Sequence, residues 1–479
     1  MLFKKTVLGT MLLLGFTTSI MASEFDDTLK LAEQGNIEAQ FNLGSMYYKG
    51  EGVKEDKRKA FEWFQKVAEQ GDVNGQIILG DMYYKGEGVK QDKTKAFEWF
   101  QKAADQGSVR GQIVLGEMYY KGEGVEQNNE KSLEWYQKAA EQEDAMAQFI
   151  LGAVYEFGQG VKKDNKKAVE WYQKSAEQGY ADAQLNLGLM YRNGAGVKQD
   201  KIKAFELYQK AASQELVTAQ FNLGNMYLIG DGIKQDHKKA FEWYQKAAEQ
   251  GYVAAQQNLG KMYHDGDGVK QDKAKAVEWY QKAAEQGLAV AQYSLGVIYT
   301  NGDGVKLDNE KAFDLFKKSA EQGYGDAQFN LGKMYHQGEG IKQDYQKAAE
   351  WYQKAAEQGV VEAQFNLGLM YLIGDGIKQD YKKSFEWVQK AADQGYSDAQ
   401  VNLGNMFYQG YGIKQDYKKA MEWYQRAAQR RNAEAQFGIG ILYYYGKGVE
   451  QNTQTAISYF FLACQNGSSE ACEVIEQSK

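Results

Sequence analysis

The chain repeats itself every 36 residues, and this period constrains its fold more than any other feature of the sequence. A regular period of this length is typical of solenoids, in which each repeat packs only against its neighbours. The clearest marker is a glycine that recurs with no insertion at Gly44, Gly80, Gly116, Gly152, Gly188, Gly224, Gly260, Gly296, Gly332, Gly368, Gly404 and Gly440. The sequence therefore predicts twelve copies of one unit over residues 35–466, with a flanking helix at 23–34 and a capping helix at 467–479. Equivalent residues of different copies share one position, named below after the first copy.

Each copy has the pattern of two helices joined by a glycine-containing turn. In the first copy, apolar side chains recur at helical spacing over Ile37–Lys49, and Gly50 is expected to end that helix in the left-handed conformation. Asp56 is expected to cap a second helix that runs to Gln70. The Asp56 position holds Asp in ten copies and Asn in two, which suits that role. The chain contains no Pro, which favours helix throughout.

A glycine inside the first helix is costly, because Gly is about 1 kcal/mol less favourable than Ala in a helix interior. Its presence at Gly44 and at every equivalent position predicts that another side chain packs against the bare backbone there. The Ala39 and Ala60 positions also hold only Ala, Gly or Ser, so two helices can lie close together. The predicted fold class is all-α, an α-solenoid of antiparallel helix pairs. The nine Trp residues share the Trp63 position and are expected to form the core between repeats.

The first residues have the pattern of a secretory signal peptide. Lys4 and Lys5 precede an apolar stretch over residues 7–21, and Ala22 is the expected cleavage site. The apolar stretch is too short for a membrane span, which needs about 20 residues. We therefore expect export to a bacterial periplasm or secretion, with residues 1–22 removed. Removing the two lysines changes the net charge from −7 to −9, which disfavours nucleic acid as a partner.

The repeat resembles the Sel1-like repeat, a relative of the tetratricopeptide repeat. The resemblance rests on Ala39-Gln-Phe-Asn-Leu-Gly44-Ser-Met-Tyr-Tyr48, on Gly50-Glu-Gly52-Val-Lys-Glu-Asp56 and on Lys59-Ala-Phe-Glu-Trp-Phe-Gln-Lys66. It implies a right-handed superhelix that serves as an adaptor for other proteins. One departure is visible, since the Lys54 position commonly holds Pro in that family.

Exported, cysteine-rich relatives of this family are described as binding or hydrolysing β-lactams, so we searched for the residues that such chemistry needs. The Ser-x-x-Lys pair of serine β-lactamases is absent, as are Gly-x-Ser-x-Gly, His-Glu-x-x-His and phosphate-binding loops. His264 and His336 share one position but lie two repeats apart, too far to hold one metal ion. The sequence thus predicts no enzyme, cofactor or metal site. A β-lactam- or peptidoglycan-directed hydrolase stays as an alternative by family analogy.

The two cysteines lie at the end of the chain. The segment Ala463-Cys464-Gln-Asn-Gly-Ser-Ser-Glu-Ala471-Cys472 resembles the bridged hairpins of the cysteine-rich relatives. In an oxidising compartment this resemblance implies a disulfide between Cys464 and Cys472. Two free buried thiols are the alternative.

A partner surface is expected on the first helices, which line the concave face of such solenoids. The positions of Glu38, Asn42, Ser45 and Lys49 form one stripe there and vary between repeats, as does Tyr48 beside them. The candidate partner-binding residues form two groups. A ladder of aromatic and cationic side chains consists of Tyr48, Lys49, Tyr84, Lys85, Tyr120 and Lys121, and an apolar step in the fourth repeat consists of Met146, Ile150 and Phe157. The predicted function is an exported non-enzymatic scaffold that binds a protein or peptide, with an acidic segment suited to the ladder. A glycan-binding module is a further alternative. The similar residues of different repeats could also result from duplication of blocks of repeats rather than from selection for a ligand.

Overall fold

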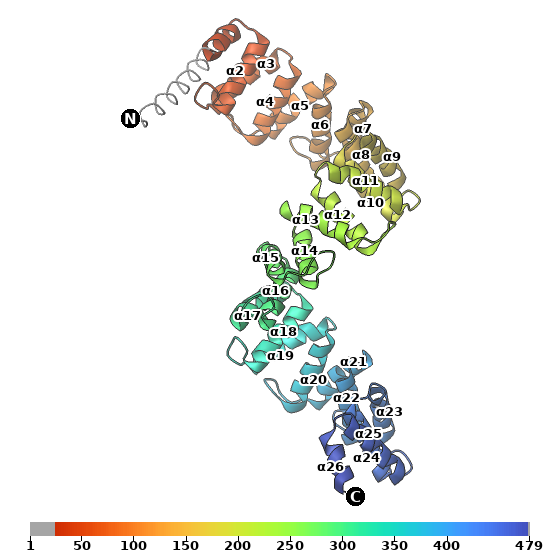
Figure 1. The fold of residues 1–479 in the computed structure, drawn as a ribbon. Helices are drawn as coiled ribbons and strands as arrows, with labels where there is room; N and C mark the ends of the chain where they lie inside the picture. The colour runs from red at the N-terminus through yellow and green to blue at the C-terminus, as the bar shows by residue number, and fades with distance from the viewer. Residues whose placement is uncertain (1–23, 478–479) are drawn as a thin grey trace, which may run out of the picture. The chain divides into compact units, whose positions relative to one another are not determined.

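The computed structural model describes residues 24–477, so the predicted signal peptide lies outside the described residues. Residues 24–33 are helical and precede the first repeat. The chain divides into two compact units, Met1–Trp243 and Tyr244–Lys479, and within each unit helices that follow one another in the chain pack together (Figure 1). Helix is the regular secondary structure found over the described residues. The all-α solenoid predicted from the period is confirmed.

Each repeat contributes a first and a second helix. The first helices are α2 (Ile37–Lys49), α4 (Val73–Lys85), α6 (Val109–Lys121), α8 (Ala145–Phe157), α10 (Ala181–Asn193), α12 (Val217–Ile229), α14 (Val253–Asp265), α16 (Ala289–Asn301), α18 (Gly325–Gln337), α20 (Val361–Ile373), α22 (Ser397–Gln409) and α24 (Ala433–Tyr445). The second helices are α3 (Lys57–Glu69), α5 (Lys93–Asp105), α7 (Asn129–Glu141), α9 (Asn165–Glu177), α11 (Lys201–Ser213), α13 (His237–Glu249), α15 (Lys273–Glu285), α17 (Asn309–Glu321), α19 (Tyr345–Glu357), α21 (Tyr381–Asp393), α23 (Tyr417–Ala428) and α25 (Thr453–Gln465). A closing helix, α26, spans Ser469–Gln477.

The helix ends follow the local signals in the sequence. Gly50 ends α2 with a φ of 75°, a left-handed conformation that a residue with a Cβ adopts only at a cost. The Asp56 side chain accepts hydrogen bonds from the backbone N–H groups of Arg58 and Lys59 at the start of α3. The Asp or Asn at this position caps the second helix in every repeat. Both predicted caps are therefore confirmed.

The glycine inside the first helix lies against the second helix of its own repeat in at least eleven of the twelve repeats. A Cβ added to Gly44 would lie 3.0 Å from the Phe64 ring, and one added to Gly188 would lie 2.6 Å from the Tyr208 ring. Phe64 and Tyr208 are almost fully buried, with 2% and 0% exposure. The predicted close contact is present, and an aromatic ring of the second helix makes it in most repeats.

A buried glutamine at the Gln40 position joins neighbouring elements through its amide. Gln40 Nε2 donates to the carbonyl of Ala32 at 3.0 Å, while Gln40 Oε1 accepts from Gln70 Nε2 at 2.6 Å. The same pair of bonds recurs at Gln76 and Gln148. These amides satisfy polar groups that burial would otherwise leave unpaired, and they fix the spacing of the helices.

The Trp63 position lies at the edge of the core in most repeats, whereas Trp423, with 9% exposure, is part of the core. Trp63 is half-buried, and the ammonium group of Lys66 lies 3.9 Å from its ring centroid. Lys or Arg three residues on covers Trp99, Trp135, Trp171, Trp279, Trp351, Trp387 and Trp423 in the same way. The ring thus packs on the core with one face and on a cation with the other.

Candidate partner-binding surfaces

The tyrosines of the predicted ladder take part in the junctions between repeats. The Tyr48 hydroxyl donates to Glu87 Oε2 at 2.6 Å, and Lys57 Nζ donates to Glu87 Oε1 at 3.0 Å. Lys57 also lies 5.2 Å from the centroid of the Tyr48 ring. The next junction repeats this arrangement with Tyr84, Lys93 and Glu123. The cation beside each of these tyrosines is therefore the lysine nine residues on, not the adjacent lysine that the sequence pattern suggested.

These junctions shift the acidity of their carboxylates. The hydrogen bond from Tyr48, followed by that from Lys57, holds the pKa of Glu87 below its usual range. The hydrogen bond from Lys93, followed by that from Tyr84, lowers the pKa of Glu123. Both glutamates are therefore ionised at neutral pH, and each carries a charge that its neighbours in the junction neutralise.

Other junctions keep the same geometry with different side chains. Asp231 accepts from Arg192 at 2.8 Å and pairs with Lys201 at 2.7 Å. At the last junction the charge is reversed, since Lys447 donates to the Tyr408 hydroxyl at 2.9 Å. When the residue at the Tyr48 position changes, the residues 9 and 39 positions further along change with it in several of the repeats. That correlation within the chain was the signal that could have identified the junction from the sequence.

The lysines of the ladder are exposed on the first helices. Lys49 lies 3.7 Å from Glu51, and Lys121 pairs with Glu117 at 2.5 Å. Lys85 is exposed at the end of α4, and Tyr120 is half-buried at the end of α6. The lysines are thus accessible to a partner, whereas Tyr48 and Tyr84 already have partners within the chain.

The apolar step predicted on α8 is accessible at both ends. Met146 is 50% exposed and Phe157 is 64% exposed, whereas Ile150 is half-buried against the core. Phe157 occupies the Lys49 position, and the structure adds exposed apolar side chains at the same position in other repeats. They are Ile229 (62%), Ile373 (65%) and Tyr445 (60%).

Two hollows lie on the first helices of the second unit. The first, of 440 Å³, is formed by α18, α20 and the Tyr352 side chain, and Ile373 lies at its wall. The second, of 390 Å³, lies between α22, α24 and the start of α26, with Tyr424 and Phe437 in its lining. A Cβ added to Gly438 would lie 2.9 Å from the Tyr424 ring, so this glycine brings the backbone of α24 close to that ring. The sequence pattern did not single out either hollow.

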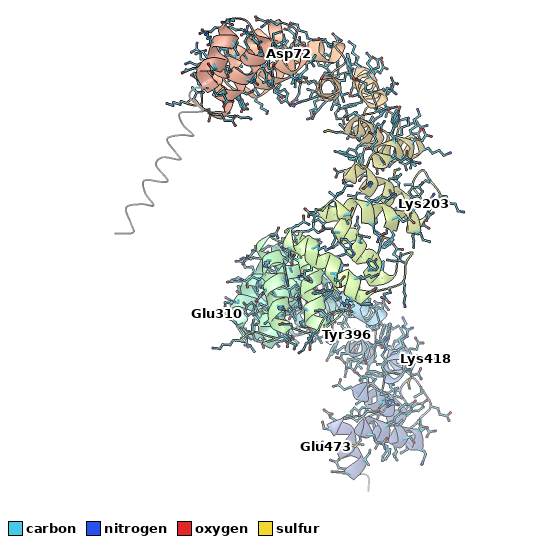
Figure 2. All side chains as sticks on the ribbon, turned by 45° about the horizontal axis from the view of Figure 1, so that its top comes forward. Asp72, Lys203, Glu310, Tyr396, Lys418 and Glu473 are labelled. Atoms are coloured by element: carbon cyan, nitrogen blue, oxygen red, sulfur yellow. A yellow bond between two sulfur atoms is a disulfide. The ribbon has the colours of Figure 1, made fainter. Side chains whose placement is uncertain are left out.

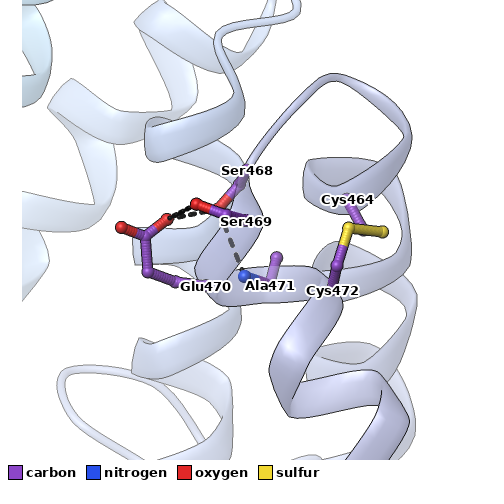
Figure 3. The surroundings of a disulfide bond; sticks show 6 residues. All are labelled: Cys464, Ser468, Ser469, Glu470, Ala471 and Cys472. Atoms are coloured by element: carbon purple, nitrogen blue, oxygen red, sulfur yellow. Dashed lines mark hydrogen bonds between the residues drawn. A yellow bond between two sulfur atoms is a disulfide. The ribbon is translucent and has the colours of Figure 1, made fainter.

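The structure brings Cys464 and Cys472 together in a disulfide, with Cα atoms 4.8 Å apart (Figure 3). The pair takes the place of a recurring contact. In other repeats the glutamine amide at the Cys472 position donates to the carbonyl eight residues earlier, at the position of Cys464. A covalent link thus replaces the hydrogen bond where the chain leaves its last repeat.

The described residues contain no cluster of three or more metal-binding side chains. His264 contacts Asp265 at 2.7 Å and Asp303 at 3.6 Å, whereas the His336 ring lies 5.2 Å from the Tyr345 ring. The two histidines therefore have separate surroundings. Over residues 24–477, no helix combines the length and the apolar character that crossing a bilayer requires.

Paired helices, close glycine contacts and recurring junctions define an α-solenoid of the tetratricopeptide-like class. The chain belongs to the Sel1 repeat family, whose model matches twelve consecutive segments from residues 37–72 to residues 433–468. The matched segments begin two residues after the units predicted from the period.

Two solved structures resemble the chain over most of their length. A protective antigen present in uropathogenic Escherichia coli strains, with an SLR fold, is 36% identical with a TM-score of 0.74, and the match covers 95% of this chain and 97% of the antigen. A Sel1 repeat protein from Oxalobacter formigenes is 32% identical with a TM-score of 0.51, and the match covers 65% of this chain and 90% of that one. A search of curated proteins gave no match.

Proposed function

We propose that this protein is an exported, non-enzymatic scaffold that binds a protein partner on the exposed side of its first helices. A Sel1 repeat solenoid is a scaffold whose class is associated with protein interaction, and the proposal adds the surface and the compartment. The observation that carries the proposal is the repeated exposure of a large apolar side chain at the Lys49 position.

Phe157, Ile229 and Ile373 each project from the last turn of a first helix with more than 60% of their surface exposed. A single exposed apolar residue on a surface is ordinary, but here one position of the repeat exposes such a residue on α8 and α12 of the first unit and on α20 of the second. Burial of a large apolar side chain under a partner removes its apolar surface from water, which is worth about 1.5–3 kcal/mol when the burial is complete. The hollow beside Ile373 offers such a partner a place for its own side chains.

The first three repeats place lysines where these apolar residues stand later in the chain. Lys49, Lys85 and Lys121 would attract an acidic segment of the same partner, and salt would screen that attraction over about 8–10 Å. The proposed partner is therefore a protein with an apolar contact region and an acidic stretch. Tyr48 and Tyr84 contribute less than the sequence pattern suggested, because their hydroxyls are already bonded within the junctions.

Three observations support export. Residues 1–22 have the pattern of a signal peptide, and the cysteine pair is suited to an oxidising compartment. The similar Escherichia coli protein is described as a protective antigen. Together they favour a role at the cell envelope or toward a host.

The test compares affinity capture by the parent with capture by the variant F157S/I229S/I373S. The immobilised chain is the bait, and extracts of the cell envelope and of host cells supply the candidate partners. Mass spectrometry quantifies each captured protein. The matched control is I202S/L307S, which removes exposed apolar side chains outside the first helices. We expect one partner to be retained by the parent and the control and reduced at least tenfold by the triple variant. Equal capture by all three proteins would overturn the proposed surface.

Three further measurements separate the components of the proposal. The variant K49E/K85E/K121E should weaken binding of the same partner most at low salt. Incubation of the purified chain with nitrocefin tests the hydrolase alternative directly, since turnover would show a β-lactam-directed enzyme. Detection of the chain in a periplasmic or culture fraction tests export.

A further inference from the structure

Two repeats lack the aromatic ring at the Trp63 position, and both carry a pocket there. Leu207 and Leu315 replace Trp in repeats that are otherwise built like their neighbours. Leu207 lines a pocket of 230 Å³ in the first unit, and Leu315 lines one of 340 Å³ in the second unit. The substitution and the pocket thus occur together twice, at sites 108 residues apart.

The two pockets are built from equivalent side chains. Each lies between consecutive second helices and the first helix that separates them in the chain. Around Leu207 the lining residues are Gln173, Ala176, Glu177, Leu187, Tyr191, Lys203, Glu206 and Lys210. Around Leu315 they are Gln281, Ala284, Glu285, Gln292, Leu295, Tyr299, Lys311, Asp314 and Lys318. Two independent copies of one arrangement indicate that the pocket follows from the Leu substitution rather than from a local irregularity.

The floor of each pocket is apolar and its rim is charged. Leu187 and Ala176 are buried below Leu207, with 4% and 8% exposure, whereas Lys210 is exposed at the rim. Lys203, labelled in Figure 2, lies on α11 with its ammonium group 5.2 Å from the Tyr191 ring centroid. The rim also carries the carboxylates of Glu177 and Glu206, and the lysines beside the apolar floor suit a flat aromatic ring better than an aliphatic chain.

The other repeats show how such a ring is held. In seven of the repeats that have Trp, the ring packs on the core, and the lysine three residues further along lies 3.7–4.1 Å from the ring centroid. Lys210 and Lys318 occupy the same position beside a leucine, which offers no π face. The cation of the usual pair is therefore in place, and its aromatic partner is missing from the chain.

We propose that each of these two pockets binds an aromatic side chain presented by a partner polypeptide, with tryptophan as the preferred residue. The incoming ring would take the place of the missing indole, resting on Leu187 or Leu295 and lying under Lys210 or Lys318. This site is on the side of the second helices and is independent of the surface proposed above, so either proposal can fail without the other.

The test uses the full chain and the neutral probe N-acetyl-L-tryptophanamide, with saturation-transfer NMR as the readout. N-acetyl-L-leucinamide is the matched control probe. The variant L207W/L315W restores the residue found in most repeats and should fold at least as well as the parent. We expect the tryptophan probe to receive saturation from the parent, and this signal to fall at least fivefold in the variant.

A second part of the experiment replaces Trp by Leu instead of Leu by Trp. The variant W171L/W279L places a leucine at the Trp63 position in one further repeat of each unit, and it should increase the signal from the tryptophan probe. Circular dichroism checks that its helical content is unchanged. The variant K210Q/K318Q should reduce the signal without affecting the fold, because both lysines are exposed. Equal signals from the parent and L207W/L315W, or equal signals from the two probes on the parent, would overturn the proposal.

Discussion

Tyr48 donates its hydroxyl hydrogen to Glu87 at 2.6 Å, and this bond joins the first helix of one repeat to the turn that follows the first helix of the next. Its equivalent between Tyr84 and Glu123 joins the second repeat to the third. The two residues of each pair are 39 positions apart in the chain, so the contact exists only when consecutive repeats are packed. It acts as a bond between repeats and not within one.

Removing these hydroxyls should weaken the junctions without disturbing the helices. In the variant Y48F/Y84F the rings remain, but Glu87 and Glu123 each lose a donor, and a hydrogen bond of this kind contributes about 0.5–1.5 kcal/mol. We expect a lower Tm with unchanged helical circular dichroism. Y444F is a control, since Tyr444 lies at the exposed end of α24. A Tm equal to that of the parent would show that the bond does not stabilise the junction.

The junction glutamates predict a specific pH dependence. The folded-state pKa of Glu87 and of Glu123 is lowered, so their ionised forms stabilise the folded chain. This contribution is complete above the unfolded-state pKa of about 4.3 and is lost as the pH falls through the lower folded-state pKa. The Tm of E87Q/E123Q should therefore lie below that of the parent at pH 7, and the difference should shrink as the pH falls toward about 3. A difference that stays constant over this range would contradict the assignment.

The close contact between Gly188 and Tyr208 predicts that even a methyl group is not tolerated there. A Cβ at Gly188 would lie 2.6 Å from a fully buried ring, and overpacking of this kind costs about 1–3 kcal/mol. That cost exceeds the helix-propensity gain of about 1 kcal/mol from Gly to Ala. We expect G188A to lower the thermal stability.

The matched control for this substitution is G44A. At Gly44 the nearest ring atom is 3.0 Å from the added Cβ, so a small movement of Phe64 relieves the contact. G44A should therefore be less destabilising than G188A. If the two variants unfold at the same temperature, the distance to the ring does not set the cost.

The cysteine pair should stabilise the end of the chain locally. A disulfide that closes so short a loop contributes about 2–3 kcal/mol, and in a repeat array the effect stays near the site. In C464S/C472S we expect faster amide exchange in α25 and α26, with exchange in α2 and α3 unchanged, as measured by hydrogen–deuterium exchange. The parent treated with a reductant should match the variant. Two free thiols in protein recovered from an oxidising compartment would exclude the disulfide.

The sequence by itself determined the local structure of each repeat. The bounds of α2, the left-handed Gly50 and the Asp56 cap were all predicted, because such signals act through backbone groups only a few residues away. The period alone predicted the solenoid, since a helix pair cannot bury its apolar face without a neighbour. The glycine at the Gly44 position predicted a close contact, although it did not identify the ring that makes it.

Only the tertiary structure decided which side chains of different repeats meet. Tyr48 was assigned to a partner surface because its position varies, and packing also gives it Glu87 and Lys57 as partners within the chain. The pockets at Leu207 and Leu315 each form between three helices. The replacement of Trp by Leu therefore did not indicate a pocket from the sequence alone. The physical reason is common to both cases. A residue at a varied position can contact either the neighbouring repeat or a partner, and the 36-residue period does not distinguish these two kinds of contact.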